Sequence, residues 1–340
     1  MYVADRTWPE LGEYVAEESV AVVPLGSTEQ HGPHLPLATD HLIAEGLARE
    51  AADRTGFLCT PTVNVGVSPH HRQFHGTMWV DAPTFRDYVE SMTRNLAYHG
   101  VDRVVYVNAH GGNVEHLREV GRRLRDDGTL YAVEWMWDES IPGLVDDVFE
   151  HNGPHGGPKE TAMIQHLAPE LVRDDRLEAA RDGGLRDVEG VEFLRHHGAR
   201  TFYDAVENSE NGVFGDQTGA SAEVGAELFE AAVDQLVQLL EWLDDRRLDD
   251  LLAPAHVDPQ PGSRRPEQWP RLAPVVGAIR RRSVVGTLRR RGRLRRFRSR
   301  GRRRSPRRPR RTTRTPVGSR RRSVPTASRS GPPGAPPSAA

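Results

Sequence analysis

The chain has 340 residues, a single cysteine and a formal net charge of -2. One cysteine excludes an internal disulfide, and no apolar run reaches the roughly 18 residues that a membrane-spanning helix needs. Residues 1–6 contain no basic segment followed by an apolar one, so we expect no signal peptide and a cytoplasmic protein without a membrane anchor.

The small net charge conceals two parts of opposite sign. Residues 1–261 hold 47 acidic and 20 basic side chains, a net charge of about -27. Residues 262–340 hold 26 arginines and one acidic residue, a net charge of about +25. Lys159 is the only lysine. An acidic, lysine-poor body is typical of a halophilic protein, because high salt screens its self-repulsion.

Short apolar segments alternate with segments of helical periodicity over residues 1–250. This alternation predicts βαβ units, a mainly parallel sheet and the α/β fold class. Cys59 lies in the second predicted strand, where we expect a small buried apolar side chain rather than a reactive thiol. The predicted strands are 20–25, 58–63, 103–108 and 130–135, and the predicted helices are 41–54, 84–98, 114–126 and 222–243.

Residues 251–340 have a different composition, with repeated prolines, arginine clusters and a Gly/Pro/Ala/Ser end. Such a segment cannot bury a core, so we expect a domain over 1–250 followed by a disordered tail. One hypothesis is a nucleic-acid-binding arm, because arginines neutralise phosphates. We favour a frameshift product or a dispensable extension: aspartate codons of GC-rich DNA read as arginine codons when shifted by one base, and aromatic residues do not interleave the arginines.

The densest polar loop follows the first predicted strand, where residues 24–40 read PLGSTEQHGPHLPLATD. Glu29 and His31 are two residues apart, so in an extended chain both project to the same side and can meet one cation. Asp40 lies where the loop gives way to a helix, and alone it would be explained as an N-cap. Together we interpret the three as metal ligands. For His34 and His41 two interpretations remain open: a position behind the ligands, which they would support, or a position on the surface.

Two Gly-rich loops add further ligand types. NAHGGN at 108–113 follows a predicted strand, and ligands bind beyond the carboxyl ends of parallel strands, so His110 should share an edge with the first loop. HGGPKET at 155–161 opens a helix and supplies His155 and Glu160. Imidazoles and carboxylates without a thiolate favour Zn²⁺ or Mn²⁺, with Fe²⁺ as a further candidate, in a pair that one carboxylate bridges.

Two other residue types near these loops have alternative explanations. Lys159 is a candidate for stabilising an oxyanion, or else a solvated side chain. Asn108 and Asn113 either orient ligands or cap the ends of the elements that they join.

These motifs resemble the creatininase (creatinine amidohydrolase) family over about residues 7–245. The resemblance implies a three-layer α/β/α sandwich, usually a homohexamer, with a two-metal amidohydrolase site. By position, Glu29, His31, Asp40 and His110 match the family's metal ligands, Asp40 as the bridge, and His155 matches a histidine that assists turnover. The matching segments are 26–36, 108–113 and 155–161, with weaker matches at 74–77 and 211–223.

The chain departs from creatininase itself at three places. Gly111-Gly112 stands where creatininase has a Tyr-Glu pair whose Glu binds the second metal, so Glu160 is the candidate replacement. No tryptophan lies within 150–154, shortly before the third motif, and His75 replaces a usual proline. The Gly-Gly form is similar to relatives that deformylate a ribosylaminopyrimidine intermediate and to the peptidase-like member linked to mycofactocin.

The sequence therefore predicts a metal-dependent hydrolase of a non-peptide C–N bond in an amide, cyclic amide or formamide. Metal-activated water would attack the carbonyl, and His155 or Glu160 would pass a proton to the leaving nitrogen. The alternatives are the deformylase, a non-catalytic scaffold with a nucleic-acid-binding tail, and a member that binds metal without turnover. We expect a small-molecule amide substrate, a homo-oligomer, and no nucleic-acid partner despite the tail.

Overall fold

The computed structural model describes residues 1–150, 152–181, 194, 196–199, 202 and 204–253. By its internal contacts the chain divides into two units, Met1–Val275 and Val276–Ala340, and every described residue belongs to the first. The predicted tail falls outside the described residues except for 251–253. Within the described part, no helix has the length and apolar character needed to cross a membrane.

A four-stranded parallel sheet forms the centre of the described domain. Its strands are β1 (Val20–Leu25), β2 (Leu58–Cys59), β3 (Arg103–Asn108) and β4 (Tyr131–Met136), in the order β2-β1-β3-β4. Every residue of β1 and β3 is buried, as expected for strands in the middle of a parallel sheet that is covered on both faces. The predicted α/β class and the parallel sheet are confirmed.

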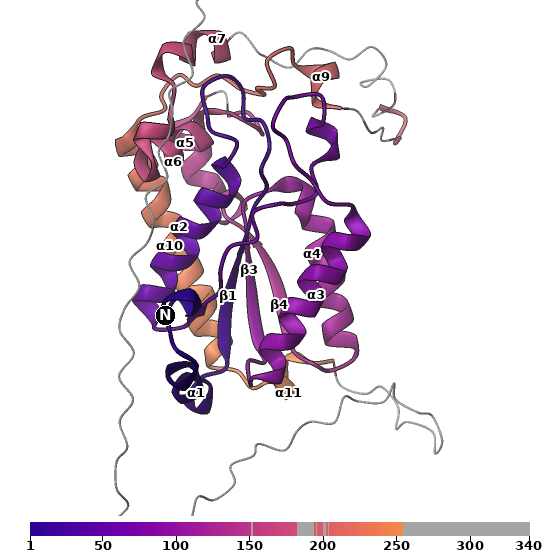
Figure 1. Ribbon diagram of the computed structural model, residues 1–340. Helices are drawn as coiled ribbons and strands as arrows, with labels where there is room; N and C mark the ends of the chain where they lie inside the picture. The colour runs from indigo at the N-terminus through magenta and orange to yellow at the C-terminus, as the bar shows by residue number, and fades with distance from the viewer. Residues whose placement is uncertain (151, 182–193, 195, 200–201, 203, 254–340) are drawn as a thin grey trace, which may run out of the picture. The chain divides into compact units, whose positions relative to one another are not determined.

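Helices cover both faces of this sheet (Figure 1). On one face pack α2 (Thr39–Thr55), α6 (Pro158–Leu167) and α10 (Ala222–Asp244); on the other pack α3 (Ala82–Tyr98) and α4 (Val114–Asp126). Alternate residues of β1 enter the two separate apolar cores. The expected three-layer sandwich is therefore present, and the four helices predicted by periodicity begin and end within two residues of their predicted bounds.

The second strand is shorter than predicted. β2 ends at Cys59, and beyond it Val63 makes only an isolated bridge with Leu25. Pro61 lies between them and has no N–H to donate to a neighbouring strand, which accounts for the break. Cys59 is buried, and burial raises the pKa of its thiol to about 12, so the prediction of an inert apolar side chain is confirmed.

Several described helices have no counterpart in the sequence prediction, and the longest of them is the first in the chain. α1 (Trp8–Glu17) is mostly exposed and is held by Tyr14, whose buried hydroxyl donates to the Val20 carbonyl at 2.6 Å and accepts from the Leu58 amide at 3.0 Å. The other described helices and turns are α5 (Pro142–Val148), α7 (Leu177–Arg181), α9 (Ala205–Asn208), α11 (Leu248–Leu251), η1 (Val3–Asp5), η2 (Pro69–His71), η3 (Gly111–Asn113), η4 (Asp138–Ser140), η5 (Pro169–Leu171) and η6 (Asp174–Arg176).

The loops at the carboxyl ends of the strands are tied to one another. A Cβ at Gly26, just after β1, would lie 2.4 Å from the backbone nitrogen of His41, so only glycine permits this close approach to α2. The Asn113 side chain donates to the Gly26 carbonyl at 3.0 Å and accepts from the Val67 amide at 3.1 Å. These bonds bring the segments that follow β1, β2 and β3 to one place.

Candidate active site

The predicted ligands and proton carriers come together at the carboxyl edge of the sheet. They arise from the loop after β1, the start of α2, the loop after β3 and the segment that opens α6. Each is buried, with at most 9% of its surface exposed: Glu29, His31, Asp40, His110, His155 and Glu160.

Asp40 occupies the middle of this group. Its Oδ1 lies 2.9 Å from His31 Nε2, and its Oδ2 lies 3.1 Å from His110 Nδ1. Glu29 stands on the His110 side, with Oε2 at 3.3 Å from His110 Nδ1. One carboxylate thus presents an oxygen to each of two imidazoles, and a second carboxylate joins one of them.

Hydrogen bonds behind the two imidazoles set which nitrogen faces Asp40. His31 Nδ1 lies 3.2 Å from the Glu29 carbonyl, and His110 Nε2 lies 3.1 Å from the Val67 carbonyl, so in the neutral rings those nitrogens donate. The lone pairs of His31 Nε2 and His110 Nδ1 then point toward carboxylate oxygens. Backbone carbonyls commonly orient metal-binding histidines in this way.

Several atoms at the centre are buried without a hydrogen-bond partner: both carboxylate oxygens of Glu29, His31 Nε2 and Asp40 Oδ2. Buried polar atoms rarely stay unpaired, and lone pairs facing lone pairs at about 3 Å repel unless a positive charge lies between them. The donor set of carboxylates and imidazoles suits a divalent cation. The residues present therefore fit a metal centre.

The pKa values of the group also indicate that its negative charge is not balanced by positive charge. Burial opposes protonation of His31, but the charges of Asp40, Glu160 and Glu29 outweigh it and raise its pKa to about 10. Burial, opposed by the charge of His31 and aided by that of Asp40, raises the pKa of Glu160 to about 7. In the absence of a metal ion, the negative charge of the buried carboxylates can be balanced only if side chains of the group take up protons. A bound cation would balance it directly.

Known proteins similar to this chain include several hydrolases. The family model described as creatinine amidohydrolase matches residues 4–240. The mycofactocin precursor peptide peptidase of Mycobacterium ulcerans (strain Agy99) is 35% identical over 246 residues, 69% of this chain and 86% of the relative. The creatinine amidohydrolase of Pseudomonas putida is 30% identical over 196 residues, 52% of this chain and 75% of the relative.

A further relative is the 2-amino-5-formylamino-6-ribosylaminopyrimidin-4(3H)-one 5'-monophosphate deformylase of Methanobrevibacter smithii (strain ATCC 35061 / DSM 861 / OCM 144 / PS), 27% identical over 230 residues, 66% of this chain and 92% of the relative. The solved structure "Creatininase Mn" superposes with a TM-score of 0.59 at 26% identity, covering 72% of this chain and 99% of that one. The chain belongs to the creatininase family. It is accordingly an amidohydrolase, an enzyme that hydrolyses a C–N bond.

The Gly-Gly pair that distinguishes this chain from creatininase has a structural consequence. A Cβ at Gly112 would lie 2.2 Å from the Val67 carbonyl oxygen and 2.4 Å from His110 Nε2, whereas a Cβ at Gly111 would meet nothing within 4 Å. A glutamate at 112 therefore does not fit beside the His110–Val67 hydrogen bond. Glu160, the predicted replacement ligand, groups instead with His31, since their ligand atoms and one of His155 lie within 4.8 Å of one another.

Other residues considered from the sequence have structural partners. His34 is buried and its Nε2 shares a hydrogen bond of 2.9 Å with Thr161 Oγ1, which ties the first loop to α6, whereas His41 is only partly buried. Lys159 is buried and pairs with Asp138 at 2.5 Å, so it is not a solvated side chain. His75 is exposed.

Of the two asparagines in the loop after β3, Asn113 joins this loop to two others, Asn108 bonds the backbone of its own loop, and neither caps a helix with its side chain. Asn113 bonds as described above, and the Asn108 side chain accepts from the His110 amide at 3.1 Å and donates to the His110 carbonyl at 3.0 Å. Neither side chain makes a hydrogen bond to the unpartnered atoms at the centre.

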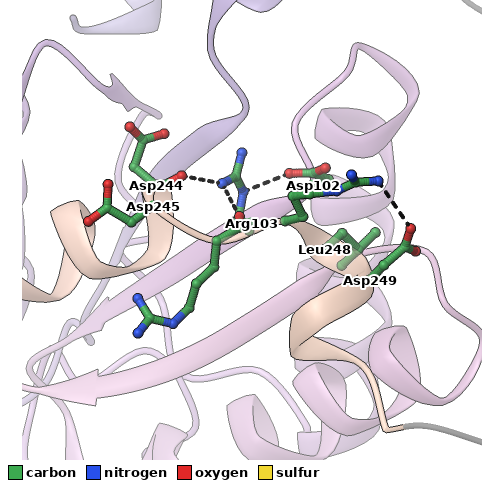
Figure 2. Close-up of a pocket in the computed structure, with 8 residues that line it drawn as sticks. Asp102, Arg103, Asp244, Asp245, Leu248 and Asp249 are labelled. Carbon is green, nitrogen blue, oxygen red and sulfur yellow. Dashed lines mark hydrogen bonds and ion pairs between the residues drawn. The ribbon is translucent and has the colours of Figure 1, made fainter.

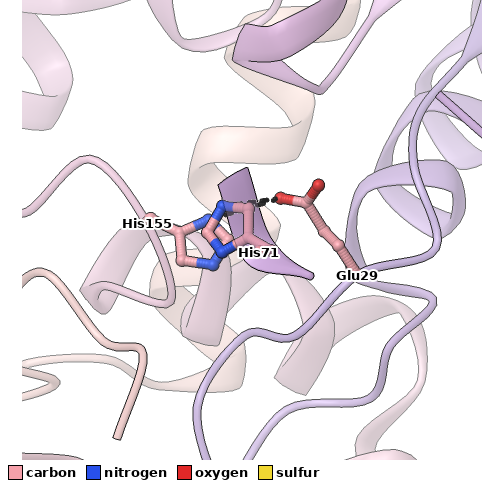
Figure 3. A group of neighbouring side chains, drawn as sticks. All are labelled: Glu29, His71 and His155. Atoms are coloured by element: carbon pink, nitrogen blue, oxygen red, sulfur yellow. Dashed lines mark ion pairs between the residues drawn. The ribbon is translucent and has the colours of Figure 1, made fainter. Parts of the chain in front are cut away.

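Two residues of the site were missed by the sequence analysis. His71 Nε2 lies 3.4 Å from Glu29 Oε1, beside His155 (Figure 3), and Gln30 contacts both imidazoles. His71 comes from the segment after β2, which by the rule of strand ends also lies at this edge. The adjacent His70-His71 pair in that segment was the signal that could have identified it.

A charged pocket of about 420 Å³ lies away from this centre, where β3 begins (Figure 2). Arg103 Nη1 donates to the carbonyls of Leu243 at 3.0 Å and Asp244 at 2.9 Å, the last turn of α10. These bonds satisfy carbonyls that lack a partner within the helix, so we assign Arg103 a structural role.

Proposed function

We propose that the chain hydrolyses its C–N bond with two divalent cations, Zn²⁺ or Mn²⁺ and alternatively Fe²⁺, held by Glu29, His31, Asp40, His110 and Glu160. The observation that carries this proposal is Asp40, which presents one oxygen to each of two imidazoles while the facing atoms lack hydrogen bonds. His31 would serve one cation and His110 with Glu29 the other. When bound, the cations supply activation of water and polarisation of the substrate carbonyl.

Proton movements fall to the remaining side chains. His155 Nε2 donates to the Gln30 carbonyl at 2.6 Å, so the lone pair of its Nδ1 faces the centre and can accept a proton. Glu160 is the second candidate, in the state in which it binds no cation: burial, opposed by the charge of His31 and aided by that of Asp40, then raises its pKa to about 7, so that it can hold a proton near neutral pH and release it to the leaving nitrogen. We therefore propose His155 and Glu160 as the catalytic acid and base.

For the substrate we propose a small non-peptide amide, cyclic amide or formamide. The open space beside Gly111, where creatininase has a bulky residue, argues against creatinine itself. The similarity to the Methanobrevibacter smithii deformylase makes a formamide the first compound class to test. A second candidate is a C–N bond in a peptide, because the relative of 35% identity is named as a peptidase.

The test is metal analysis together with turnover of the purified full-length chain in high salt. The panel contains creatinine, a lactam, a formamide and a short peptide, with Zn²⁺ or Mn²⁺ supplied separately. His31→Ala should lose bound metal and activity, whereas His166→Ala, an exposed histidine on the same helix as Glu160, should keep both. Activity retained in His31→Ala would remove His31 from the site. Full metal content without any turnover would identify a member that binds metal only.

We also propose a cytoplasmic, halophilic homohexamer whose catalytic domain is 1–250 and whose tail 251–340 is dispensable or a frameshift product. The acidic body and arginine-rich end support this, as does family resemblance for the hexamer. Truncation after Asp250 should leave turnover intact. Loss of a salt-sensitive affinity for nucleic acid on truncation would favour the alternative of a binding arm.

A further inference from the structure

Two stacked imidazoles lie beside Glu29 (Figure 3), next to its Oε1, whereas His110 lies next to its Oε2. The ring centroids of His71 and His155 lie 4.3 Å apart with 25° between the ring planes. His71 presents Nε2 to Glu29 Oε1 at 3.4 Å, and His155 presents Nδ1 to the same oxygen at 3.7 Å. What each ring can do at the centre depends on which of its nitrogens carries hydrogen.

The side-chain amide of Gln30 has only one possible orientation. Its Oε1 accepts from the Gly32 amide at 2.9 Å, and its Nε2 donates to the Gly212 carbonyl at 3.0 Å. Because a backbone N–H only donates and a carbonyl only accepts, these two groups identify the oxygen and nitrogen of the amide. Space is tight as well, since a Cβ at Gly212 would lie 1.9 Å from Gln30 Oε1.

This orientation determines the tautomer of His71. Its Nδ1 lies 2.8 Å from Gln30 Nε2, which can only donate, so Nδ1 accepts and Nε2 carries the hydrogen. To bind a metal ion through Nε2, His71 would need a lone pair there and therefore a hydrogen on Nδ1. That hydrogen would point at a hydrogen of the Gln30 side-chain amide, and the two would repel. His71 is thus unsuited to bind a cation although it lies beside Glu29, and its N–H faces the centre.

His155 receives the opposite role from the same residue. Its Nε2 donates to the backbone carbonyl of Gln30, which leaves a lone pair on Nδ1. Gln30 Nε2 also lies 3.0 Å from His155 Nε2, but its two hydrogens serve the Gly212 carbonyl and His71. One glutamine therefore makes one ring a donor and leaves the other an acceptor toward the centre.

We propose that His71 is a catalytic hydrogen-bond donor whose Nε2–H binds the carbonyl oxygen of the substrate amide, and that Gln30 is the positioning residue that keeps it a donor. The inference rests on the proposed amide hydrolysis. The hydrogen stays on His71, because negative charge on the oxygen is stabilised by a hydrogen bond without proton transfer.

The first test reads the tautomer independently of activity. Zn²⁺-loaded protein with ¹⁵N-labelled histidine shows in its two-bond ¹H–¹⁵N correlations which ring nitrogen carries hydrogen, and His71→Ala assigns the signal. We expect Nε2–H in the parent protein. In Gln30→Glu the carboxylate accepts instead of donating, so His71 should convert to Nδ1–H while His155, bonded to a backbone carbonyl, stays unchanged. An Nδ1–H form of His71 in the parent protein would overturn the proposal.

The second test separates catalysis from metal binding. His71→Ala should lower kcat about 10²- to 10³-fold, the cost of removing one oxyanion donor, with KM and Zn²⁺ content essentially unchanged. His71→Gln, which offers an amide N–H near the place of Nε2, should restore part of kcat. Loss of Zn²⁺ from His71→Ala, or an unchanged kcat, would refute the role proposed for His71 but not the proposed amide hydrolysis. No turnover of any amide by the parent protein would instead refute the proposed function.

Discussion

Gly112→Ala should weaken metal binding without touching a ligand. The new methyl group would lie 2.2 Å from the Val67 carbonyl oxygen and 2.4 Å from His110 Nε2, inside the hydrogen bond of 3.1 Å that joins them. Val67 or His110 must move, and the ring loses the partner that directs its Nδ1 toward Asp40. Loss of such a supporting bond typically costs 10- to 100-fold in metal affinity, or about 1.4–2.7 kcal/mol.

Chelator competition with Zn²⁺ measures this affinity, and Gly111→Ala is the matched control. A Cβ at Gly111 meets nothing within 4 Å, and its backbone is not left-handed, so the control should bind Zn²⁺ like the parent protein. The control should also gain about 0.4–1 kcal/mol in free energy of unfolding, because alanine restricts the unfolded chain. Equal Zn²⁺ affinities of the two variants would refute the reasoning that the Val67 carbonyl orients His110.

Three further predictions concern the fold and its pH dependence. Tyr14→Phe removes hydrogen bonds to Val20 and Leu58 and should lower the free energy of unfolding in urea by about 1–3 kcal/mol; no change would show that the hydroxyl is dispensable. Burial, aided by the charge of His31, lowers the pKa of His34 from 6.5 to about 4, so only the unfolded chain binds this proton between those values. The metal-free protein should therefore lose up to about 3 kcal/mol as pH falls from 6.5 to 4, and His34→Gln should flatten that slope. Cys59 should react with a thiol reagent only after unfolding, and rapid labelling of the native protein would contradict its burial.

The layers of the fold were predictable because their signals are local and strong. β1 is a continuous apolar run, β3 contains one between Arg103 and Asn108, and both strands are found at their predicted bounds. α1 was not predicted, although Leu11, Tyr14 and Val15 recur at helical spacing and lie in or against one of the two apolar cores. Its sequence did carry a different signal, since Thr7 and Glu10 form a capping box, and a search for caps would have found the start of this helix.

The convergence of the site was predictable because topology, rather than distance along the chain, determines it. Parallel strands end at one edge, so the loops after β1 and β3 had to meet there, and Glu29 and His110 lie 3.3 Å apart. The sequence did not predict that Glu160 would lie near His31 rather than near His110. That position depends on how α6 enters the site, which Gly156 sets by donating its amide to Glu160 Oε2 at 2.5 Å, with its own backbone at a φ of +58°.

Gln30 was not predicted as a site residue because the alternation of side chains in an extended chain places it on the side opposite to Glu29 and His31. In an extended chain Glu29 and His31 share a side and the residue between them faces away, which is why only the outer two were interpreted as functional. The segment is a loop and not a strand, and Gly212 folds back over it, so the amide of Gln30 turns to the imidazoles of His71 and His155. Alternation of side chains is a reliable guide to ligands in a strand, where backbone pairing enforces it. In a loop that a second segment covers, the side chain between two ligands can face the same centre as they do. It can then orient the groups that react there.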